Sequence, residues 1–212
     1  MTEKVIGVAN ANLANQITTA EIDSIQDDVQ LAVANLLTAL RIDTENDHNT
    51  KDTAKRVAKM YVREVFKGRY EPPPTLTEFP NVSNLDDVYT LGPITVRSAC
   101  SHHLVPIVGK LWVGVLPSEK VIGISKFVRL AEWVMARPQI QEEAVMMLAD
   151  ELERLLNPRG VAIIMEAQHL CMTWRGVRES ATVMTSSVVR GAFRDDATLR
   201  AELMQLLQAK NR

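Results

Sequence analysis

The first part of the chain carries hydrophobic residues at helical spacing. Thr18 and Glu21 form a capping-box pattern that predicts a helix start, and apolar positions then recur every three or four residues to about position 40. A second helix is predicted over residues 50–66. Residues 1–17 are rich in Asn and Ala and have no clear period, which predicts a mobile N-terminal tail.

The pattern changes after Pro72-Pro73-Pro74, a stiff connector. Beyond it, alternating positions rich in β-branched residues predict strands, and two stretches between the strands have helical periodicity. The predicted elements are strands at 89–96, 105–116 and 121–124, a helix from Ser125 to a break at Pro138, a helix at 141–156, strands at 161–174 and 182–189, and a closing helix at 195–208. Hairpin strands with a helix pair between them favour an α+β fold with an antiparallel sheet.

We expect three parts along the 212 residues. They are the mobile tail at 1–17, an N-terminal helical arm at 18–70 and a core at 75–212. The arm is too small to be stable alone, so the proline connector is interpreted as a boundary between an arm and a core, and not between independent domains.

Composition and charge narrow the class of protein. The net charge of −2 gives no global basic surface for nucleic acid. No apolar run approaches the ~20 residues of a membrane span, and the N-terminus lacks the features of a signal peptide. The two cysteines fit cytoplasmic thiols better than a disulfide framework, although a single Cys100–Cys171 bridge remains open on counting alone. We therefore expect a soluble, cytoplasmic protein.

Two short segments hold most of the side chains that soft metal ions prefer. Residues 98–103 contain one of the two cysteines and two of the four histidines, and residues 169–171 contain the other cysteine and a third histidine. Thiol and imidazole groups suit Zn²⁺, and a catalytic zinc needs only three protein ligands. Because each cysteine has a histidine nearby, a metal site is favoured over the alternative of buried structural cysteines.

The spacing within these segments predicts how the ligands meet. His169 and Cys171 are two residues apart and would point to one side of a regular strand. Cys100 and His103 are three apart, so the chain must turn there, on the entry loop of the strand at 105–116. Two cysteines and one histidine would leave an open coordination position, which favours catalysis, and the remaining histidines are candidates for proton transfer.

Basic residues recur near predicted turns. Each one alone is explained as a solvated surface charge, but together with the metal segments they suggest a phosphate-bearing substrate. They are Arg56, Lys59, Lys126, Arg129 and Arg175. Glu142 fits the preference of helix starts for acidic residues, although a carboxylate can also accept from the adjacent N1–H and 2-amino donors of guanine.

Several separated segments, in the same order, resemble the GTP cyclohydrolase I family. They are RVAKMY (56–61), CSHHLVPIVGK (100–110), VIGISKFVR (121–129), RPQIQE (137–142) and HLCMTWRGV (169–177). Three positions depart from the family pattern: Ser101 replaces a common Glu, Ala54 a common Pro, and Trp174 a smaller residue. None of the three removes a metal ligand.

The resemblance implies a role for each matching residue. The metal ligands fall on Cys100, His103 and Cys171, and the further catalytic histidines on His102 and His169. The guanine is held by Glu142 with Gln141 beside it, and Ser125 lies near the ribose. The triphosphate-binding positions fall on the five basic residues named above.

The resemblance also implies an architecture and a reaction. Family members have a T-fold, an antiparallel sheet with a helix pair on one side, and form toroidal pentamers that stack into decamers with active sites between subunits. The reaction is zinc-dependent hydrolysis of GTP at C8, release of formate and rearrangement to 7,8-dihydroneopterin triphosphate. Folate, biopterin-like cofactors and modified tRNA bases all draw on this product.

The sequence leaves three other hypotheses to consider. A zinc nucleoside deaminase would carry an H-x-E…P-C-x-x-C pattern, which is missing. A related T-fold protein would bind a purine or pterin, or act on a different purine nucleotide, without the full reaction. A structural assembly protein would bury its zinc.

Overall fold

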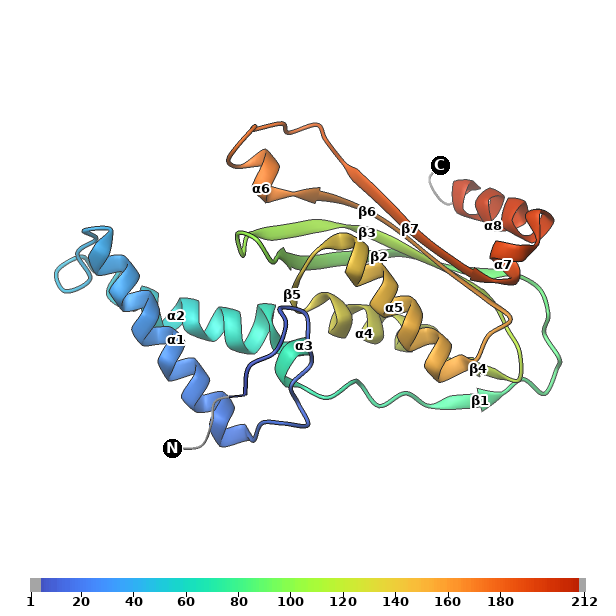
Figure 1. Ribbon diagram of the computed structural model, residues 1–212, viewed down its shortest axis with the longest axis horizontal. Helices are drawn as coiled ribbons and strands as arrows, with labels where there is room; N and C mark the ends of the chain where they lie inside the picture. Colours follow the sequence, from blue (N-terminus) through green and yellow to red (C-terminus); the bar gives the residue numbers. More distant parts are fainter. Residues whose placement is uncertain (1–4, 210–212) are drawn as a thin grey trace. The chain divides into compact units, whose positions relative to one another are not determined.

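The computed structural model describes residues 5–209, and the chain forms two compact units, Met1–Pro72 and Pro73–Arg212. The first unit is helical (Figure 1). Its helical segments are α1 (Thr19–Ala39), α2 (Thr53–Lys59), η1 (Met60–Val65) and α3 (Lys67–Tyr70).

The start of α1 is as predicted. The Thr18 hydroxyl oxygen accepts a hydrogen bond from the Glu21 backbone N–H, and the Glu21 carboxylate accepts from the Thr18 N–H. The capping box is therefore confirmed. The predicted second helix is divided, because the hydrogen-bond ladder shifts to i→i+5 bonding in η1, as in the bond from Phe66 N–H to Tyr61 O. Apolar spacing does not encode this shift.

The segment before α1 contacts α3. The Arg69 guanidinium donates to the backbone carbonyls of Gly7 and Val8, and the Leu13 N–H donates to the Arg69 carbonyl at 2.7 Å. The Leu13 side chain is only 4% exposed. The described part of the expected tail, residues 5–17, is thus held by hydrogen bonds and by one buried side chain. Residues 1–4 of that expected tail lie outside the described residues.

The second unit contains the strands. They are β1 (Glu78–Pro80), β2 (Tyr89–Cys100), β3 (Pro106–Leu116), β4 (Lys120–Ile122), β5 (Pro138–Gln139), β6 (Gly160–His169) and β7 (Met184–Gly191). Its helices are α4 (Ile124–Met135), α5 (Gln141–Leu156), α6 (Leu170–Thr173), α7 (Ala192–Asp195) and α8 (Ala197–Ala209).

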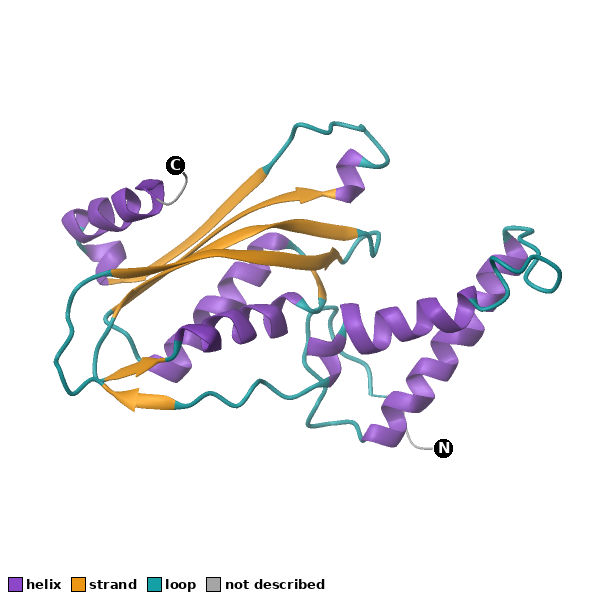
Figure 2. Cartoon of the chain, turned by 180° about the vertical axis from the view of Figure 1, so that it is seen from behind, coloured by secondary structure: helices purple, strands orange, loops and turns teal. Residues whose placement is uncertain are grey.

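The main sheet has the strand order β5-β2-β3-β6-β7, and a small sheet pairs β1 with β4. The pairs β2–β3, β3–β6 and β6–β7 are antiparallel, whereas the short β5 runs parallel to β2. Figures 1 and 2 show α4 and α5 together on one face of this sheet and α8 on the other. The predicted α+β architecture, an antiparallel sheet with a helix pair on one face, is confirmed.

Apolar clusters cover both faces of the sheet. One packs α4 and α5 onto the strands and includes Leu130, Leu148 and Val113. The other lies under α8 and includes Trp112 and Leu203. Trp112 and Val113 are adjacent in β3 but belong to different clusters, because successive side chains of a strand point to opposite faces. Burial on both faces makes this sheet a rigid support for the residues at its ends.

The start of α4 differs from the prediction. The helix begins at Ile124, and Gly123, in an extended conformation, occupies the N-cap position. The sequence predicted a helix from Ser125, whose hydroxyl could cap it, but Ser125 lies inside the first turn. A capping side chain has to precede the first helical residue, and Ser125 lies two residues after the N-cap position.

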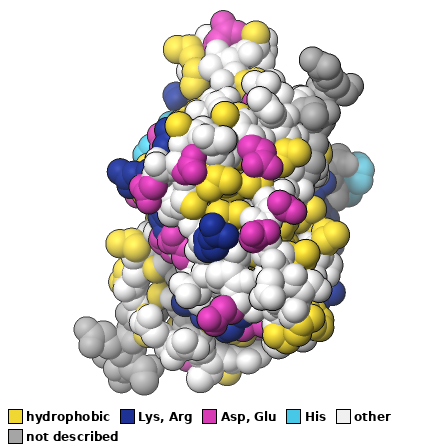
Figure 3. Space-filling model, turned by 90° about the vertical axis from the view of Figure 1, so that its right-hand side faces the viewer, with side chains coloured by type: hydrophobic (Ala, Val, Ile, Leu, Met, Phe, Trp, Pro, Cys, Tyr) yellow, Lys and Arg dark blue, Asp and Glu magenta, His cyan; other side chains and the backbone are white. Residues whose placement is uncertain are grey.

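The surface carries both signs of charge. Figure 3 shows acidic and basic side chains interspersed with apolar ones on one face. The composition agrees, with 24 Lys and Arg against 26 Asp and Glu. None of the helices within residues 5–209 combines the length and the apolar character that crossing a membrane requires.

Candidate metal centre

The first half of the centre is the tight turn between β2 and β3. Cys100 ends β2 and is 3% exposed, and its N–H donates to Val105 O at 2.9 Å. The Leu104 N–H returns to Cys100 O at 2.8 Å, and Leu104 has a positive φ of 54° that completes the reversal. The Ser101 N–H donates to the carbonyl of Gln139 on β5. The predicted turn between Cys100 and His103 is therefore present and is hydrogen-bonded on both sides.

The second half lies where β6 passes into α6. The strand ends at His169, and Cys171 lies in the helical turn Leu170–Thr173, which the bond from Trp174 N–H to Leu170 O closes. The prediction of one strand over 161–174 is thus wrong at its end. Strand alternation does not orient Cys171, because the chain has already turned into a helix.

These two halves bring three ligand atoms together. The donor atoms of Cys100, His103 and Cys171 all lie within 4.8 Å of one another, and both cysteines are free thiols, so the alternative of a disulfide is not realised. Ligand atoms around a tetrahedral Zn²⁺ lie roughly 3.5–4 Å apart. Small side-chain adjustments would therefore let these residues hold the ion, and three protein ligands leave one position open.

Charged and polar neighbours surround the three residues. Burial raises the pKa of the Cys171 thiol, the neighbouring Cys100 raises it further, and Arg175 partly offsets the rise. A thiol whose pKa is raised in this way is stabilised as a thiolate when a cation binds it. Arg175 Nη1 lies 3.3 Å from His103 Nε2, and His102 Nδ1 lies 3.7 Å from Cys100 Sγ.

His169, at the end of β6, contacts the first residue of α5. Its Nε2 lies 2.8 Å from Gln141 Oε1. Burial lowers the pKa of His169, and the carboxylate of Glu142 partly offsets this effect. Glu142 is exposed, whereas Gln141, expected beside the substrate, is fully buried with its amide bonded to protein groups.

The remaining predicted site residues lie on two helices. Ser125, Lys126 and Arg129 are in the first turns of α4, where Lys126 Nζ donates to Thr75 O at 3.4 Å. Arg56 and Lys59 are on α2 of the first unit. Arg56 donates there to Asn49 O and lies 3.8 Å from the Asp52 carboxylate.

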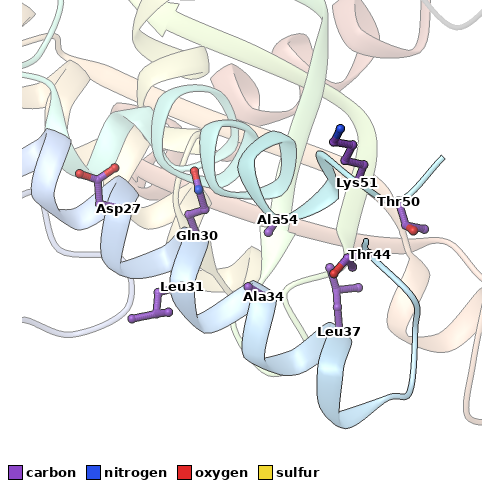
Figure 4. Close-up of a pocket in the computed structure, with 9 residues that line it drawn as sticks. All are labelled: Asp27, Gln30, Leu31, Ala34, Leu37, Thr44, Thr50, Lys51 and Ala54. Atoms are coloured by element: carbon purple, nitrogen blue, oxygen red, sulfur yellow. The ribbon is translucent and has the colours of Figure 1, made fainter. Parts of the chain in front are cut away.

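The first unit also contains a groove. Figure 4 shows that it lies between α1, the following loop and the start of α2. Its volume is about 440 Å³. The lining residues are Asp27, Gln30, Leu31, Ala34, Leu37, Thr44, Thr50, Lys51 and Ala54. None of the predicted site residues lines it.

Two supporting residues were not recognised from the sequence. Gln139 belongs to β5, which pairs with the end of β2 at Cys100. A two-residue strand is too short to leave a periodic pattern. Ser186 on β7 accepts a hydrogen bond from Gln141, and its place in an alternating Thr/Ser/Val strand was the only available signal.

Comparisons with known proteins agree with this geometry. The sequence model described as GTP cyclohydrolase I matches residues 29–208. A GTP cyclohydrolase 1 of Mycobacteroides abscessus is 41% identical over 84% of this chain and 87% of its own length. A GTP cyclohydrolase 1 of Bacillus subtilis is 39% identical over 88% of this chain and 97% of its own.

Among solved structures, the chain is similar to the apo crystal structure of an archaeosine synthase QueF-Like, with 14% identity and a TM-score of 0.38 over 57% of this chain and 97% of that one. A TM-score this low carries no argument about fold or function.

Proposed function

The chain belongs to the GTP cyclohydrolase I family, and from this premise we propose that it converts GTP to 7,8-dihydroneopterin triphosphate and formate with a bound Zn²⁺. The observation that carries the proposal is the grouping of Cys100, His103 and Cys171, whose donor atoms lie within 4.8 Å of one another. Family membership alone indicates the reaction class, and this cluster supplies a place for the metal ion that the reaction needs.

The three ligands fit zinc by their chemistry. Two thiolates and one imidazole form a donor set that zinc prefers, and hard cations such as Mg²⁺ prefer oxygen. When bound, Zn²⁺ supplies Lewis-acid chemistry, which lowers the pKa of water and makes it a nucleophile towards guanine C8 at neutral pH. The chain's own residues bind and orient GTP and move protons.

The histidines outside the ligand set carry the proton transfers. His102 and His169 serve the imidazole-ring nitrogen of guanine and the ribose oxygen, because an imidazole both gives and takes a proton near pH 7. The 2.8 Å contact of His169 with a buried amide supports a fixed ring direction. His169 is only partly buried, which leaves some of its surface accessible.

Substrate binding is assigned to the acidic and basic side chains. The exposed carboxylate of Glu142 accepts from the N1–H and 2-amino groups of guanine, and Ser125 lies near the ribose. The triphosphate is held by charge-assisted hydrogen bonds from the basic residues. They are Arg56, Lys59, Lys126, Arg129 and Arg175.

The active unit is a homo-oligomer, a decamer of two stacked pentamers with active sites between subunits. Within the described part of the chain, β7 ends the main sheet with β6 as its neighbour. An edge strand offers unpaired N–H and C=O groups to a neighbouring subunit, which supports this assembly. In the assembly, residues 75–212 form the T-fold catalytic core, residues 18–70 the helical arm and residues 1–17 the tail. The free thiols of both cysteines agree with a cytoplasmic location.

Purified, zinc-loaded protein incubated with GTP tests the proposal. We expect release of formate together with a pterin that becomes fluorescent after oxidation. Release of ammonia without formate would indicate deamination. Thermal protection by GTP without either product would favour the alternative, a T-fold paralogue that binds a purine or pterin without opening the ring.

A further inference from the structure

Gln141 begins α5, and its side chain is fully buried, with 0% exposure. Its amide nitrogen donates to the backbone carbonyl of Met165 at 3.0 Å and of Met184 at 3.1 Å, and to the Ser186 hydroxyl oxygen at 2.9 Å. Met165 lies on β6, and the other two partners lie on β7. The amide therefore ties the start of α5 to two neighbouring strands.

These partners determine which end of the amide is nitrogen. A backbone carbonyl only accepts hydrogen bonds, so the terminal atom that faces two carbonyl groups must carry hydrogen. A reversed amide would set its oxygen against two carbonyl oxygens at hydrogen-bond distance. The other end, 2.8 Å from Nε2 of His169, is therefore Oε1, an acceptor that has no proton to give.

The protonation of His169 follows from this orientation. An acceptor requires a donor opposite it, so Nε2 of His169 carries the hydrogen, and in the neutral ring Nδ1 is then unprotonated. We infer that Gln141 is a positioning residue that fixes the Nε2–H tautomer of His169 and so makes Nδ1 the atom that exchanges a proton with the substrate. The inference rests on the catalytic role of His169 in the proposed function.

The first turn of α5 thus serves two purposes with two adjacent residues. Gln141 points into the protein and holds His169, whereas Glu142 is exposed on the same turn. The proposed function assigns the guanine to Glu142. A single rigid turn, tied to β6 and β7, would therefore set the relative placement of the base-binding carboxylate and the proton-transferring imidazole.

Variants of the zinc-loaded protein separate positioning from packing. Gln141→Met keeps the length of the side chain and removes its hydrogen bonds. Gln141→Glu returns an oxygen opposite His169 Nε2, although its second oxygen faces the carbonyl groups. Ser186→Ala, the matched control, removes one partner of the amide and leaves the His169 contact intact.

A variant that no longer fixes the Nε2–H tautomer of His169 should have a lower kcat. Gln141→Met should lower kcat for formate release roughly 10- to 100-fold and change KM for GTP by less than about twofold, since a positioned acid or base contributes about 10²–10⁴ in rate. Gln141→Glu should recover part of kcat, and Ser186→Ala should stay within about twofold of the unaltered protein. If kcat instead followed the melting temperature across these variants, the effect would be structural and the inference overturned.

Solid-state NMR of the nitrogen-15-labelled protein gives the tautomer directly, without turnover. At about pH 8, where an ordinary imidazole is neutral, we expect Nε2 of His169 to be protonated and Nδ1 bare, with the signals assigned by their loss in His169→Ala. An Nδ1–H ring in the unaltered protein would refute the inference even if every variant failed to fold. Absence of formate from GTP would refute the proposed function instead, and the NMR result would still decide the tautomer.

Discussion

Ile107 on β3 lies directly opposite His169 on β6 in the antiparallel register that joins these two strands. On its other side, β3 pairs with β2, whose last residue is Cys100. The β2–β3 turn and the end of β6 therefore meet at the same end of the sheet, and Cys171, two residues beyond His169, joins them. Because a register shift of one residue would separate the two halves, the metal cluster depends on how β3 and β6 pair.

Gly109→Ala tests this dependence on strand pairing. A Cβ added at Gly109 would lie 2.0 Å from the Glu166 carbonyl oxygen and 2.6 Å from the Ala167 Cα, so β3 and β6 would have to move apart. We expect a loss of about 3 kcal/mol in the free energy of unfolding, measured by urea denaturation, together with a loss of metal affinity.

The matched control is Gly123→Ala, because beyond the adjoining residues the nearest atom to the added Cβ would be Lys126 Cγ, at 4.0 Å. It should change the urea midpoint little. Equal midpoints for the two alanine variants would contradict the close approach of β3 and β6.

Replacement of zinc by Co²⁺ tests the ligand set. A cobalt ion held by Cys100, His103 and Cys171 should give strong thiolate-to-cobalt absorption, which Cys171→Ser should weaken markedly. Chelation of the metal should abolish formate release and lower the melting temperature by a few degrees, while the far-ultraviolet circular dichroism is retained, because the clusters under α4, α5 and α8 are apolar. Unchanged cobalt absorption in Cys171→Ser would remove Cys171 from the site.

Tyr89 gives stability a dependence on alkaline pH. Burial raises its pKa to about 12, and its ring packs edge-on against Phe127 with the centroids 6.3 Å apart. The folded value lies above the ordinary value of 10.0, so the contribution of the neutral phenol is present below about pH 10 and is lost as the pH rises towards 12. Urea midpoints at about pH 9 and 11 should differ less in Tyr89→Phe than in the unaltered protein, and an unchanged difference would argue against this assignment.

Arg190 links β7 to α5 by electrostatics. One guanidinium nitrogen lies 2.6 Å from the carboxylates of both Asp150 and Glu153. Arg190→Met keeps the apolar stem and should cost about 1 kcal/mol at low salt, since these groups are partly exposed. In about 1 M NaCl the cost should shrink, because salt screens exposed charges. A cost that does not depend on salt would point to packing of the side chain and away from the ion pairs.

Elements with a local signature were predictable from the sequence. The Thr18–Glu21 capping box marks the start of α1, and the bounds of α5, Gln141–Leu156, coincide with the predicted 141–156 because its apolar period is unbroken. The three metal-ligand candidates were also recognised, since thiols and imidazoles are rare in this chain and cluster in two segments.

Features set by distant contacts were not predictable. Nothing local marks the turn of the chain from β6 into α6 before Cys171, because no Gly, Pro, Asn or Asp interrupts the residues between His169 and Gly176. The sequence showed Gln141 as a polar neighbour of Glu142, but its buried amide is hydrogen-bonded to groups as distant as Ser186, 45 positions away. Spacing describes neighbours along the chain, whereas the hydrogen bonds of a buried amide depend on which strands the fold brings to it.

The most direct test of the proposed function measures formate release from GTP and bound metal in the same sample. For the unaltered protein, we predict one zinc per chain and one formate for each pterin formed, and for Cys171→Ser a parallel loss of metal and of formate release. Fully zinc-loaded protein that releases no formate from GTP, or Cys171→Ser protein that retains the full rate, would contradict the account.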